Sequence, residues 1–357
     1  MLAPYAERAR RHPGGIIDLS VGTPVDPVPT FVQQALADAA NAPGYPTTMG
    51  TLQVREACAG WLDRRLGVAC SPGAVIPSIG SKELVAWLPT LLGLGPDAHV
   101  VVPRVAYPTY AVGAALARCQ VTATDEPETI DDASLIWINS PGNPTGRVLD
   151  PGRLAEIVSH ARSIGAIVAS DECYAELGWE AKPTSVLHPN ASGQEHRGLL
   201  ALHSLSKRSN LAGYRFGFVA GDPALISSIL EIRKHAGMMT PSPIQAAAVA
   251  ALEDDHHVDE QAARYRARRS LLRTALEGAG FTIDHSEAGL YLWATRSEPC
   301  WDTVGWCADR GLLVTPGDFY GPAGARHVRV ALTASDDDVE SCARRLGQGS
   351  GDRNSGH

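Results

Sequence analysis

The chain has 357 residues, a formal net charge of −8, 44% hydrophobic residues and 20% charged residues. At roughly 150 residues per domain, this length predicts about two domains, and the composition is that of a globular protein rather than a disordered one. The acidic balance, with no basic stripe, argues against nucleic acid as a partner. No uncharged apolar run approaches the ~20 residues that span a bilayer, and residues 1–15 lack the apolar core of a secretory signal, so we expect no membrane partner.

The seven cysteines are odd in number and widely spaced. No two of them lie in a zinc-ribbon spacing, so we expect neither a metal site nor a disulfide framework. A reducing cytoplasm suits such free thiols best. Lysine is scarce, and the chain holds only Lys82, Lys182, Lys207 and Lys234, so an enzyme that used a lysine amine would have few to choose from.

Between residues 75 and 202, short apolar runs alternate with helical patterns. The expected strands are Val75–Ile79, Leu135–Ile138, Ala166–Ala169 and Leu199–Leu202. A helical pattern follows the first run as far as Leu92, and Asp150 with Pro151 predicts the start of another helix. Strands buried on both faces of a parallel sheet read as such continuous apolar runs, so an α/β architecture is predicted.

After Gly221 the pattern changes. A helical stripe over 224–236 stops at Gly237, and an arginine-rich helix is expected from about 258 to 278. Short strands, mixed with further helices, are expected at 290–294, 312–314 and 328–332. This order predicts a second, smaller α+β domain. We assign residues 41–255 to the large domain, 1–40 and 256–346 to the small domain, and 347–357 to a flexible tail.

Polar residues cluster directly after the expected strands of the large domain. In open α/β sheets, ligands bind outside the carboxyl ends of the strands. We therefore expect four segments to share one crevice, namely Gly80–Lys82, Asn139–Gly146, Asp171–Tyr174 and Ser204–Lys207.

Lys207 has the setting of a reactive lysine. A lysine in such a crevice can form a Schiff base with a carbonyl compound, although most lysines are simply exposed. Ser204, Ser206 and Arg215 stand close to it in sequence and would supply donors for a phosphate group. This neighbourhood favours the reactive alternative.

Asp171, Tyr174 and Asn143 follow strands in the same way. An aspartate there can hold a protonated pyridine nitrogen, which makes the ring an electron sink, or it can merely cap a loop. Tyr174 and the amide of Asn143 would both reach a ring oxygen. The alternative for Asn143, in a Pro/Gly-rich segment, is an ordinary turn.

Three further features point to anions and rings. Gly80, Ser81 and Lys82 open a helix directly after a strand, where backbone N–H groups and the helix dipole favour an anion. Tyr107 would stack on an aromatic ring or lie in the core. Arg329 stands within an apolar strand, where a buried charge needs a partner. Either a substrate carboxylate or a structural salt bridge would serve.

Taken together, these motifs make the chain resemble the fold-type I pyridoxal-phosphate enzymes, in the class I/II aminotransferase family. The resemblance covers nearly the whole chain, in the family's order and spacing. The matching segments are Tyr45-Pro-Thr-Thr-Met-Gly50, Gly80-Ser-Lys-Glu83, Tyr107-Pro108, Asn143-Pro-Thr-Gly146, Asp171-Glu-Cys-Tyr174, Ser204-Leu-Ser-Lys207, Gly213-Tyr-Arg215 and Arg329. The fold implied is a large domain with a mostly parallel seven-stranded sheet plus a smaller α+β domain.

The resemblance also implies roles for these residues. Lys207 would be the Schiff-base lysine and proton shuttle, Asp171 the partner of the pyridine nitrogen, and Tyr107 the stacking residue. Asn143 and Tyr174 would bind the ring oxygen. The phosphate would be held by Gly80, Ser81, Lys82 through its backbone, Ser204, Ser206 and Arg215. Arg329, with Asn143 and Gly22 of an N-terminal strip, would bind the substrate, and Tyr45 would reach the phosphate of the neighbouring subunit in an obligate homodimer.

Ping-pong transamination is the implied reaction. The related α-oxoamine synthases usually carry Asp-Glu-Ala-His where this chain has Asp171-Glu-Cys-Tyr174, whereas a carbon–sulfur lyase shares almost all these residues and stays open. A nicotinamide dehydrogenase is disfavoured because the one G-x-G-x-x-A string, Gly93–Ala98, precedes a strand. A cofactor-binding regulator would need a DNA-binding domain for which the segment before Tyr45 has no room.

Several long stretches are similar to bacterial succinyldiaminopimelate aminotransferases. This similarity implies N-succinyl-LL-2,6-diaminopimelate and 2-oxoglutarate as substrates, in lysine and diaminopimelate biosynthesis. Aminotransferases for aspartate, aromatic or other amino acids are the alternative. The succinylated substrate carries two carboxylates beyond the one assigned to Arg329, and the candidate donors for these are Lys82, Arg208, Arg233 and Lys234.

Overall fold

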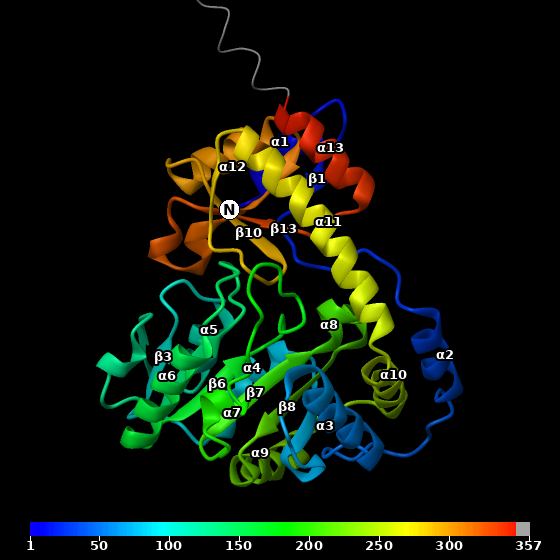
Figure 1. The fold of residues 1–357 in the computed structure, drawn as a ribbon, viewed down its shortest axis with the longest axis vertical. Coiled ribbons are helices and arrows are strands. Elements are labelled where there is room, and N and C mark those ends of the chain that lie inside the picture. The colour runs from blue at the N-terminus through cyan, green and yellow to red at the C-terminus, as the bar shows by residue number, and fades with distance from the viewer. Residues whose placement is uncertain (348–357) are drawn as a thin grey trace, which may run out of the picture.

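A seven-stranded sheet forms the centre of the larger part of the molecule in the computed structural model, which describes residues 1–347 (Figure 1). In spatial order the strands are β2 (Val75–Ile79), β8 (Phe216–Gly221), β7 (Leu199–Ser204), β6 (Ile167–Asp171), β5 (Leu135–Asn139), β3 (His99–Val102) and β4 (Gln120–Ala123). Among these strands, β8 runs antiparallel to all the others, which share one direction. The predicted mostly parallel sheet is confirmed, whereas residues 348–357 of the expected tail lie outside the described residues.

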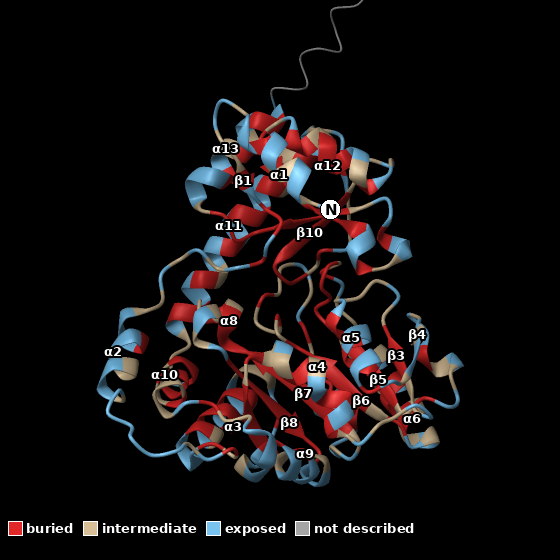
Figure 2. Cartoon of the chain, turned by 180° about the vertical axis from the view of Figure 1, so that it is seen from behind, coloured by how far each residue is buried: buried red, intermediate tan, exposed pale blue. Residues whose placement is uncertain are grey.

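Helices cover both faces of this sheet, and Figure 2 shows the buried strands between them. One face carries α2 (Thr30–Asp38), α3 (Leu52–Leu66), α6 (Pro151–Ile164), α7 (Pro189–Ser192) and α10 (Ser242–Glu253), and the other carries α4 (Ser81–Leu91), α5 (Thr109–Leu116) and α9 (Pro223–Ala236). Alternate residues of a strand point to opposite faces. In β5, Ile136 and Ile138 therefore join the first core cluster, while Leu135 and Trp137 join the second.

The predicted helix boundaries have clear local causes. The side chain of Asp150 accepts a hydrogen bond of 3.0 Å from the backbone N–H of Arg153, and Pro151 occupies the first helical position of α6, as expected of a capped start. Gly237 ends α9 with a φ of 70°, a left-handed conformation that only glycine adopts at no steric cost.

The smaller part contains a second sheet. Its antiparallel strands, in spatial order, are β12 (Thr315–Pro316), β13 (Val328–Ala331), β10 (Tyr291–Thr295) and β9 (Thr282–Asp284), and β1 (Ile17–Asp18) pairs in parallel with β11 (Leu312–Leu313). Around them lie α1 (Ala3–Arg10), α11 (His256–Gly278), α12 (Cys300–Ala308) and α13 (Asp336–Gly347). The smaller α+β part is therefore as predicted. The remaining short helices are α8 (Leu205–Arg208), η1 (Pro72–Ala74), η2 (Pro127–Thr129), η3 (Ala212–Tyr214), η4 (Gly317–Tyr320) and η5 (Pro322–Gly324).

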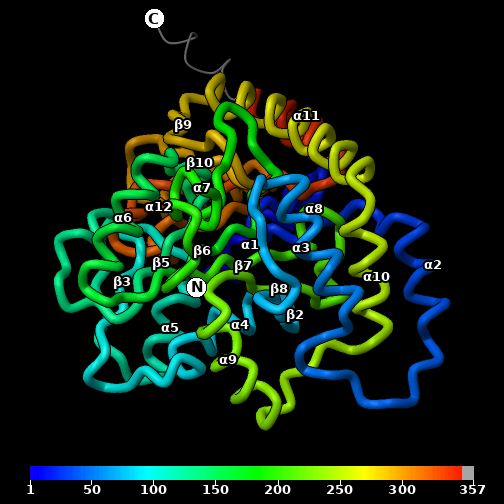
Figure 3. Tube along the Cα trace, turned by 60° about the horizontal axis from the view of Figure 1, so that its bottom comes forward, coloured from blue at the N-terminus to red at the C-terminus, as the bar shows by residue number. Residues whose placement is uncertain are grey.

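The N-terminal segment contributes to both parts. Val32 of α2 belongs to the core of the large sheet, whereas Ile17 and Leu19 belong to the core of the smaller part. Figure 3 shows α2 beside α10, and the long helix α11 connecting the region of α10 to the smaller part. The exact boundaries at residues 41 and 256 stay a prediction. No helix within residues 1–347 is long and apolar enough to cross a membrane.

A buried ion pair joins α9 to α4. Arg233 is fully buried, and its guanidinium contacts both carboxylate oxygens of Glu83 at 2.7 and 3.2 Å. Removing one partner of such a pair leaves an uncompensated buried charge. The pair therefore fixes how two helices on the same face of the large sheet meet.

We expect Glu83→Gln to lower the free energy of unfolding by about 3 kcal/mol, because Arg233 keeps its charge without a partner. Glu231→Gln is the matched control, since Glu231 pairs with Lys234 on the exposed side of the same helix α9 and should cost less than about 0.5 kcal/mol. Urea unfolding at one protein concentration measures both. Equal losses in the two variants would contradict the structural role of the buried pair.

Candidate active site

A cavity of about 580 Å³ opens at the carboxyl ends of β5, β6 and β7, beneath the N-terminal segment and the smaller sheet. Twelve of the predicted site residues line it: Gly22, Ser81, Lys82, Tyr107, Asn143, Asp171, Tyr174, Ser204, Ser206, Lys207, Arg215 and Arg329. Two do not. Gly80 lies just behind the wall, and Tyr45 is 95% exposed on the single chain.

Asp171 ends β6 and is buried in the floor of the cavity. One carboxylate oxygen, Oδ2, accepts a hydrogen bond of 2.9 Å from the hydroxyl of Tyr110, and Oδ1 accepts one of 3.3 Å from the backbone N–H of Cys173. Burial raises the pKa of Asp171, and no cationic side chain forms an ion pair with it in residues 1–347. A desolvated carboxylate held only by neutral donors suits a cationic group supplied by a ligand.

Lys207 projects from the short helix α8, which begins where β7 ends. The side chain of Ser204 caps this helix by accepting a hydrogen bond of 3.2 Å from the backbone N–H of Ser206. The amine of Lys207 donates to the backbone oxygen of Gly22. Burial lowers the pKa of this amine, which increases the fraction of neutral, nucleophilic amine at a given pH.

An anion-binding cradle lies at the start of α4. Gly80 has a φ of 74°, and a Cβ atom built on it would lie 2.3 Å from Nη2 of Arg215, so a side chain there would strain the backbone and displace that guanidinium. Arg215 itself has a φ of 57° and is steadied by donating to the oxygen of Ala212 at 2.9 Å. Hydroxyls of Ser81, Ser204 and Ser206 line the same cavity. Helix N–H groups, hydroxyls and a guanidinium together fit a phosphate.

Arg329 on β13 is buried, and no carboxylate pairs with it in the part of the chain that the structure describes. Its guanidinium donates to Oδ1 of Asn143 at 3.0 Å and to the backbone oxygen of Ser20 at 2.6 Å. It also lies 4.0 Å from the ring centroid of Tyr291, a favourable cation–π arrangement. The alternative of a structural salt bridge for Arg329 is therefore wrong, and its charge is available to an anionic ligand.

Four residues that the sequence analysis did not assign help to build the site. Tyr110 binds Asp171, and Cys173 donates to the hydroxyl of Ser81 at 3.1 Å. The hydroxyl of Tyr291 lies 3.2 Å from that of Tyr174. Asn139 ends β5 and bonds to backbone atoms on both sides of the crevice. Of these, Asn139 and Cys173 lie in segments that the sequence analysis placed in the crevice after strands, whereas Tyr110 and Tyr291 carried no recognisable signal.

Three of the proposed donors for distal carboxylates do not line the cavity. Arg208 is buried in an ion pair with Glu176, and Arg233 is paired with Glu83. Lys234 pairs with Glu231 on the outer surface of α9. Their assignment as distal donors is wrong, because acidic partners distant in sequence occupy the first two. Lys82 does line the cavity, with its amine 5.8 Å from the ring centroid of Tyr107.

The residues present fit pyridoxal phosphate. A buried carboxylate without a cation would meet the ring nitrogen, the cradle at Gly80 and Arg215 would meet the phosphate, and a buried lysine of lowered pKa would meet the carbonyl carbon. By contrast, residues 1–347 contain no group of three His, Cys, Asp or Glu side chains arranged to hold a metal ion.

Comparisons with known proteins agree with this chemistry. The sequence profile described as "Aminotransferase class I and II" matches residues 14–346. The chain is 55% identical to 4-dedimethylamino-4-oxo-anhydrotetracycline transaminase OxyQ of Streptomyces rimosus, with 97% of each protein covered. It is 57% identical to the probable aminotransferase Rv1178 of Mycobacterium tuberculosis, with 97% of this chain and 83% of that protein covered.

A solved structure shows the same fold. The probable N-succinyldiaminopimelate aminotransferase of Thermus thermophilus superimposes with a TM-score of 0.88 at 29% identity, with 97% of this chain and 98% of that chain covered. The fold, the cavity and the matching sequences lead to one conclusion. The chain belongs to the class I and II aminotransferases and is a pyridoxal-phosphate-dependent enzyme of that family.

Proposed function

We propose that this aminotransferase exchanges amino groups between N-succinyl-LL-2,6-diaminopimelate and glutamate, through their respective 2-oxo acids. The proposal of an acidic substrate rests on Arg329. Its buried guanidinium faces the same cavity as Lys207 and has no carboxylate partner within residues 1–347. A bound carboxylate would remove the cost of that unpaired charge. The likeness to the Thermus protein supports the choice of substrate.

The chain's own residues would divide the work as follows. Pyridoxal phosphate, when bound, supplies an electrophilic carbonyl carbon and a ring that accepts electrons. Lys207 would provide the amine that holds the cofactor at that carbon and that moves the proton of the substrate Cα. Asp171 would keep the ring nitrogen protonated. Oδ1 of Asn143 already accepts from Arg329, which leaves its amide N–H₂ to donate to the ring oxygen together with the hydroxyl of Tyr174.

The remaining residues hold the two ends of the ligand. Tyr107 would stack on the ring, and Gly22, on the N-terminal segment, would lie over the substrate carboxylate. The phosphate ligands are Ser81, Ser204, Ser206, Arg215 and the backbone of Gly80 and Lys82.

All seven cysteines are free thiols in the structure, which supports a cytoplasmic location.

Lys207→Ala should abolish covalent attachment of the cofactor and the half-reaction with an amino acid, because Lys82, the other lysine at the cavity among the described residues, lies against Tyr107 and away from Asp171. Borohydride reduction followed by mass spectrometry of peptides measures the attachment, and the cofactor's absorption band measures the half-reaction. Lys234→Ala, on the outer surface of α9, is the control and should behave as wild type. Covalent cofactor or wild-type turnover in Lys207→Ala would overturn the assignment.

Tyr110→Phe should weaken cofactor binding by about tenfold, because the lost hydrogen bond is made to the charged carboxylate of Asp171. The hydroxyl of Tyr110 favours the charged form of Asp171, so its loss raises the pKa of Asp171 further and weakens its hold on a cationic ring nitrogen. Titration of the cofactor-free protein with pyridoxal phosphate measures the affinity. Tyr265→Phe is the matched control, because Tyr265 is buried and its hydroxyl makes no hydrogen bond within residues 1–347. The same loss in both would refute a specific role for Tyr110.

Lys82 is the remaining candidate for a distal carboxylate. Its side chain is exposed at the cavity wall and forms no ion pair in the described part of the chain. A charge-assisted hydrogen bond from its amine would favour the succinylated substrate over a short amino acid.

Lys82→Met should lower the rate with N-succinyl-LL-2,6-diaminopimelate about tenfold and hardly change the rate with alanine, with 2-oxoglutarate as acceptor in both assays. Equal losses on the two substrates would place Lys82 in the cofactor site instead. Should wild type ignore the succinylated substrate altogether, the substrate proposal fails, while the aminotransferase chemistry stands.

A second candidate substrate follows from the 55% identity with the Streptomyces transaminase, whose name specifies a 4-oxo-anhydrotetracycline. A large cyclic ketone would then be the amino acceptor in the same cavity. Measuring the aminotransfer rate with such a ketone in place of 2-oxoglutarate separates the two candidate amino acceptors, because only one of them should give rapid turnover.

Tyr45 supports an obligate dimer. A tyrosine ring that is 95% exposed is unusual for a chain with a large core, and on a second copy of the chain it would reach the phosphate cradle. We expect hybrid dimers of Lys207→Ala and Tyr45→Phe subunits to contain one complete site, since each subunit supplies the residue that the other lacks. Cofactor titration of the mixture should therefore recover a fraction with wild-type affinity. An active monomer in sedimentation would contradict this arrangement.

A further inference from the structure

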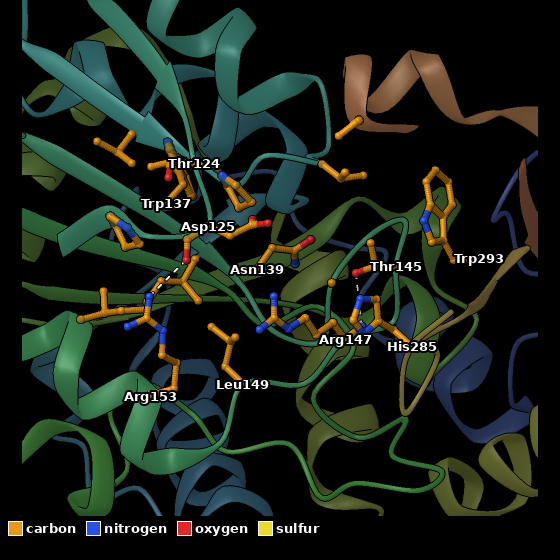
Figure 4. Close-up of a pocket in the computed structure, with 18 of the residues that line it drawn as sticks. Thr124, Asp125, Trp137, Asn139, Thr145, Arg147, Leu149, Arg153, His285 and Trp293 are labelled. Atoms are coloured by element: carbon orange, nitrogen blue, oxygen red, sulfur yellow. Dashed lines mark hydrogen bonds between the residues drawn. The ribbon is translucent and has the colours of Figure 1, made fainter. Parts of the chain in front are cut away.

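A second cavity, of about 250 Å³, lies beside the loop that carries Asn143, and Figure 4 shows side chains that line it. Asn143 lines the active-site cavity, whereas Gly142 and Thr145 line the second one, and the two cavities share no lining residue among those described. Its walls come from β3, β5 and α6 of the large part and from β9, β10 and η5 of the smaller part. The volume lies just below the roughly 300–1,000 Å³ of drug-sized ligand sites, so it suits a small metabolite.

One wall is flat and largely apolar. Trp293, which is 3% exposed, stacks in parallel on His327 with the ring centroids 4.9 Å apart. Leu149, Ile157 and Val101 add apolar side chains to the lining of the same cavity. Such a surface gains most from a flat apolar molecule, because ring stacking adds to the burial of apolar area. The Nδ1 atom of His327 is buried and has no hydrogen-bond partner within residues 1–347.

The charges of the cavity are mostly satisfied within the protein. Arg153 binds Glu128 at 2.8 Å, and Asp284 binds His327 at 2.7 Å. Arg147 differs, because its guanidinium makes no hydrogen bond or ion pair in the part of the chain that the structure describes. Figure 4 shows this side chain extending among the lining residues toward Leu149. An anionic group on a ligand would therefore find a cation available to bind it.

Asp125 limits the charge of that ligand. It lines the same cavity and is exposed, and its carboxylate only accepts a hydrogen bond of 3.1 Å from the backbone N–H of Arg104 among the described residues. A second carboxylate on the ligand would meet this negative charge and be disfavoured. The lining thus selects a single negative charge attached to an apolar body.

We propose that this cavity binds a small aromatic carboxylate, with its ring against Trp293 and its carboxylate on Arg147. The site would communicate with the active centre through Asn139, which lines the cavity. The amide of Asn139 donates to the backbone oxygen of Asp171 at 2.9 Å, and its oxygen accepts from the backbone N–H of Asn143 at 2.7 Å. A bound molecule contacts the side chain that positions two residues of the cofactor site.

Calorimetric titration of the cofactor-loaded enzyme with 3-phenylpropionate tests the proposal. Arg147→Gln should weaken the binding of 3-phenylpropionate about tenfold, since it removes a charge-assisted contact. The uncharged 3-phenylpropionamide should bind the wild-type enzyme as weakly as 3-phenylpropionate binds Arg147→Gln. Arg104→Gln is the matched control, because Arg104 is exposed close by and its side chain does not line the cavity. It should titrate as wild type. Succinate, a dianion without a ring, should not compete.

A crystallographic experiment tests where the ligand binds. Crystals of the loaded enzyme soaked in 3-(4-bromophenyl)propionate should show an anomalous bromine peak beside Trp293. Ala323→Trp, which fills the rim of the cavity, should abolish both the peak and the Arg147-dependent binding, and it provides a second variant should Arg147→Gln be unstable. Identical titrations of wild type and Arg147→Gln, or bromine only in the cavity around Lys207, would overturn the proposal.

Discussion

At the end of β5, the side-chain amide of Asn139 donates to the backbone oxygens of Pro141 and Asp171 and accepts from the backbone N–H of Asn143. These bonds tie the carboxyl end of β6 to the loop that carries Asn143. A buried backbone group left without its partner costs about 1–3 kcal/mol, so loop and strand are held at one separation. Asp171 and Asn143, which both line the active-site cavity, are thereby held in a fixed relative position.

The active-site cavity has an excess of positive charge, which suits anionic ligands. Four cationic side chains line it, Lys82, Lys207, Arg215 and Arg329, against the single carboxylate of Asp171. The positive charges of Arg329 and Arg215 add to the burial that lowers the pKa of Lys207. The excess of cations matches the two anionic groups proposed above as ligands, a phosphate and a substrate carboxylate.

Much of this site was predictable because strand ends are recognisable in the sequence. Val75–Ile79 ends at Gly80 as expected, and twelve predicted residues meet in one cavity. Pairing across long sequence distances was not recognisable: nothing near Arg208 or Arg233 identifies Glu176 or Glu83 as partners. The edge strand β4 also escaped notice, because its residues are mostly exposed. Tyr110 and Tyr291 look like ordinary core aromatics until the fold brings their hydroxyls to Asp171 and Tyr174.

Residues 17–20 contact segments near the far end of the chain, among them the strand that carries Arg329. Ile17 pairs with Leu312 in a parallel bridge, the backbone oxygen of Leu19 accepts from the N–H of Ala331, and the oxygen of Ser20 accepts from Arg329. Contacts that close so long a loop form slowly, because chain entropy must be lost first. During synthesis the N-terminal segment must therefore wait until β13 has left the ribosome. The hydrogen bond between Arg329 and the backbone oxygen of Ser20 can therefore form only after most of the chain has been synthesised.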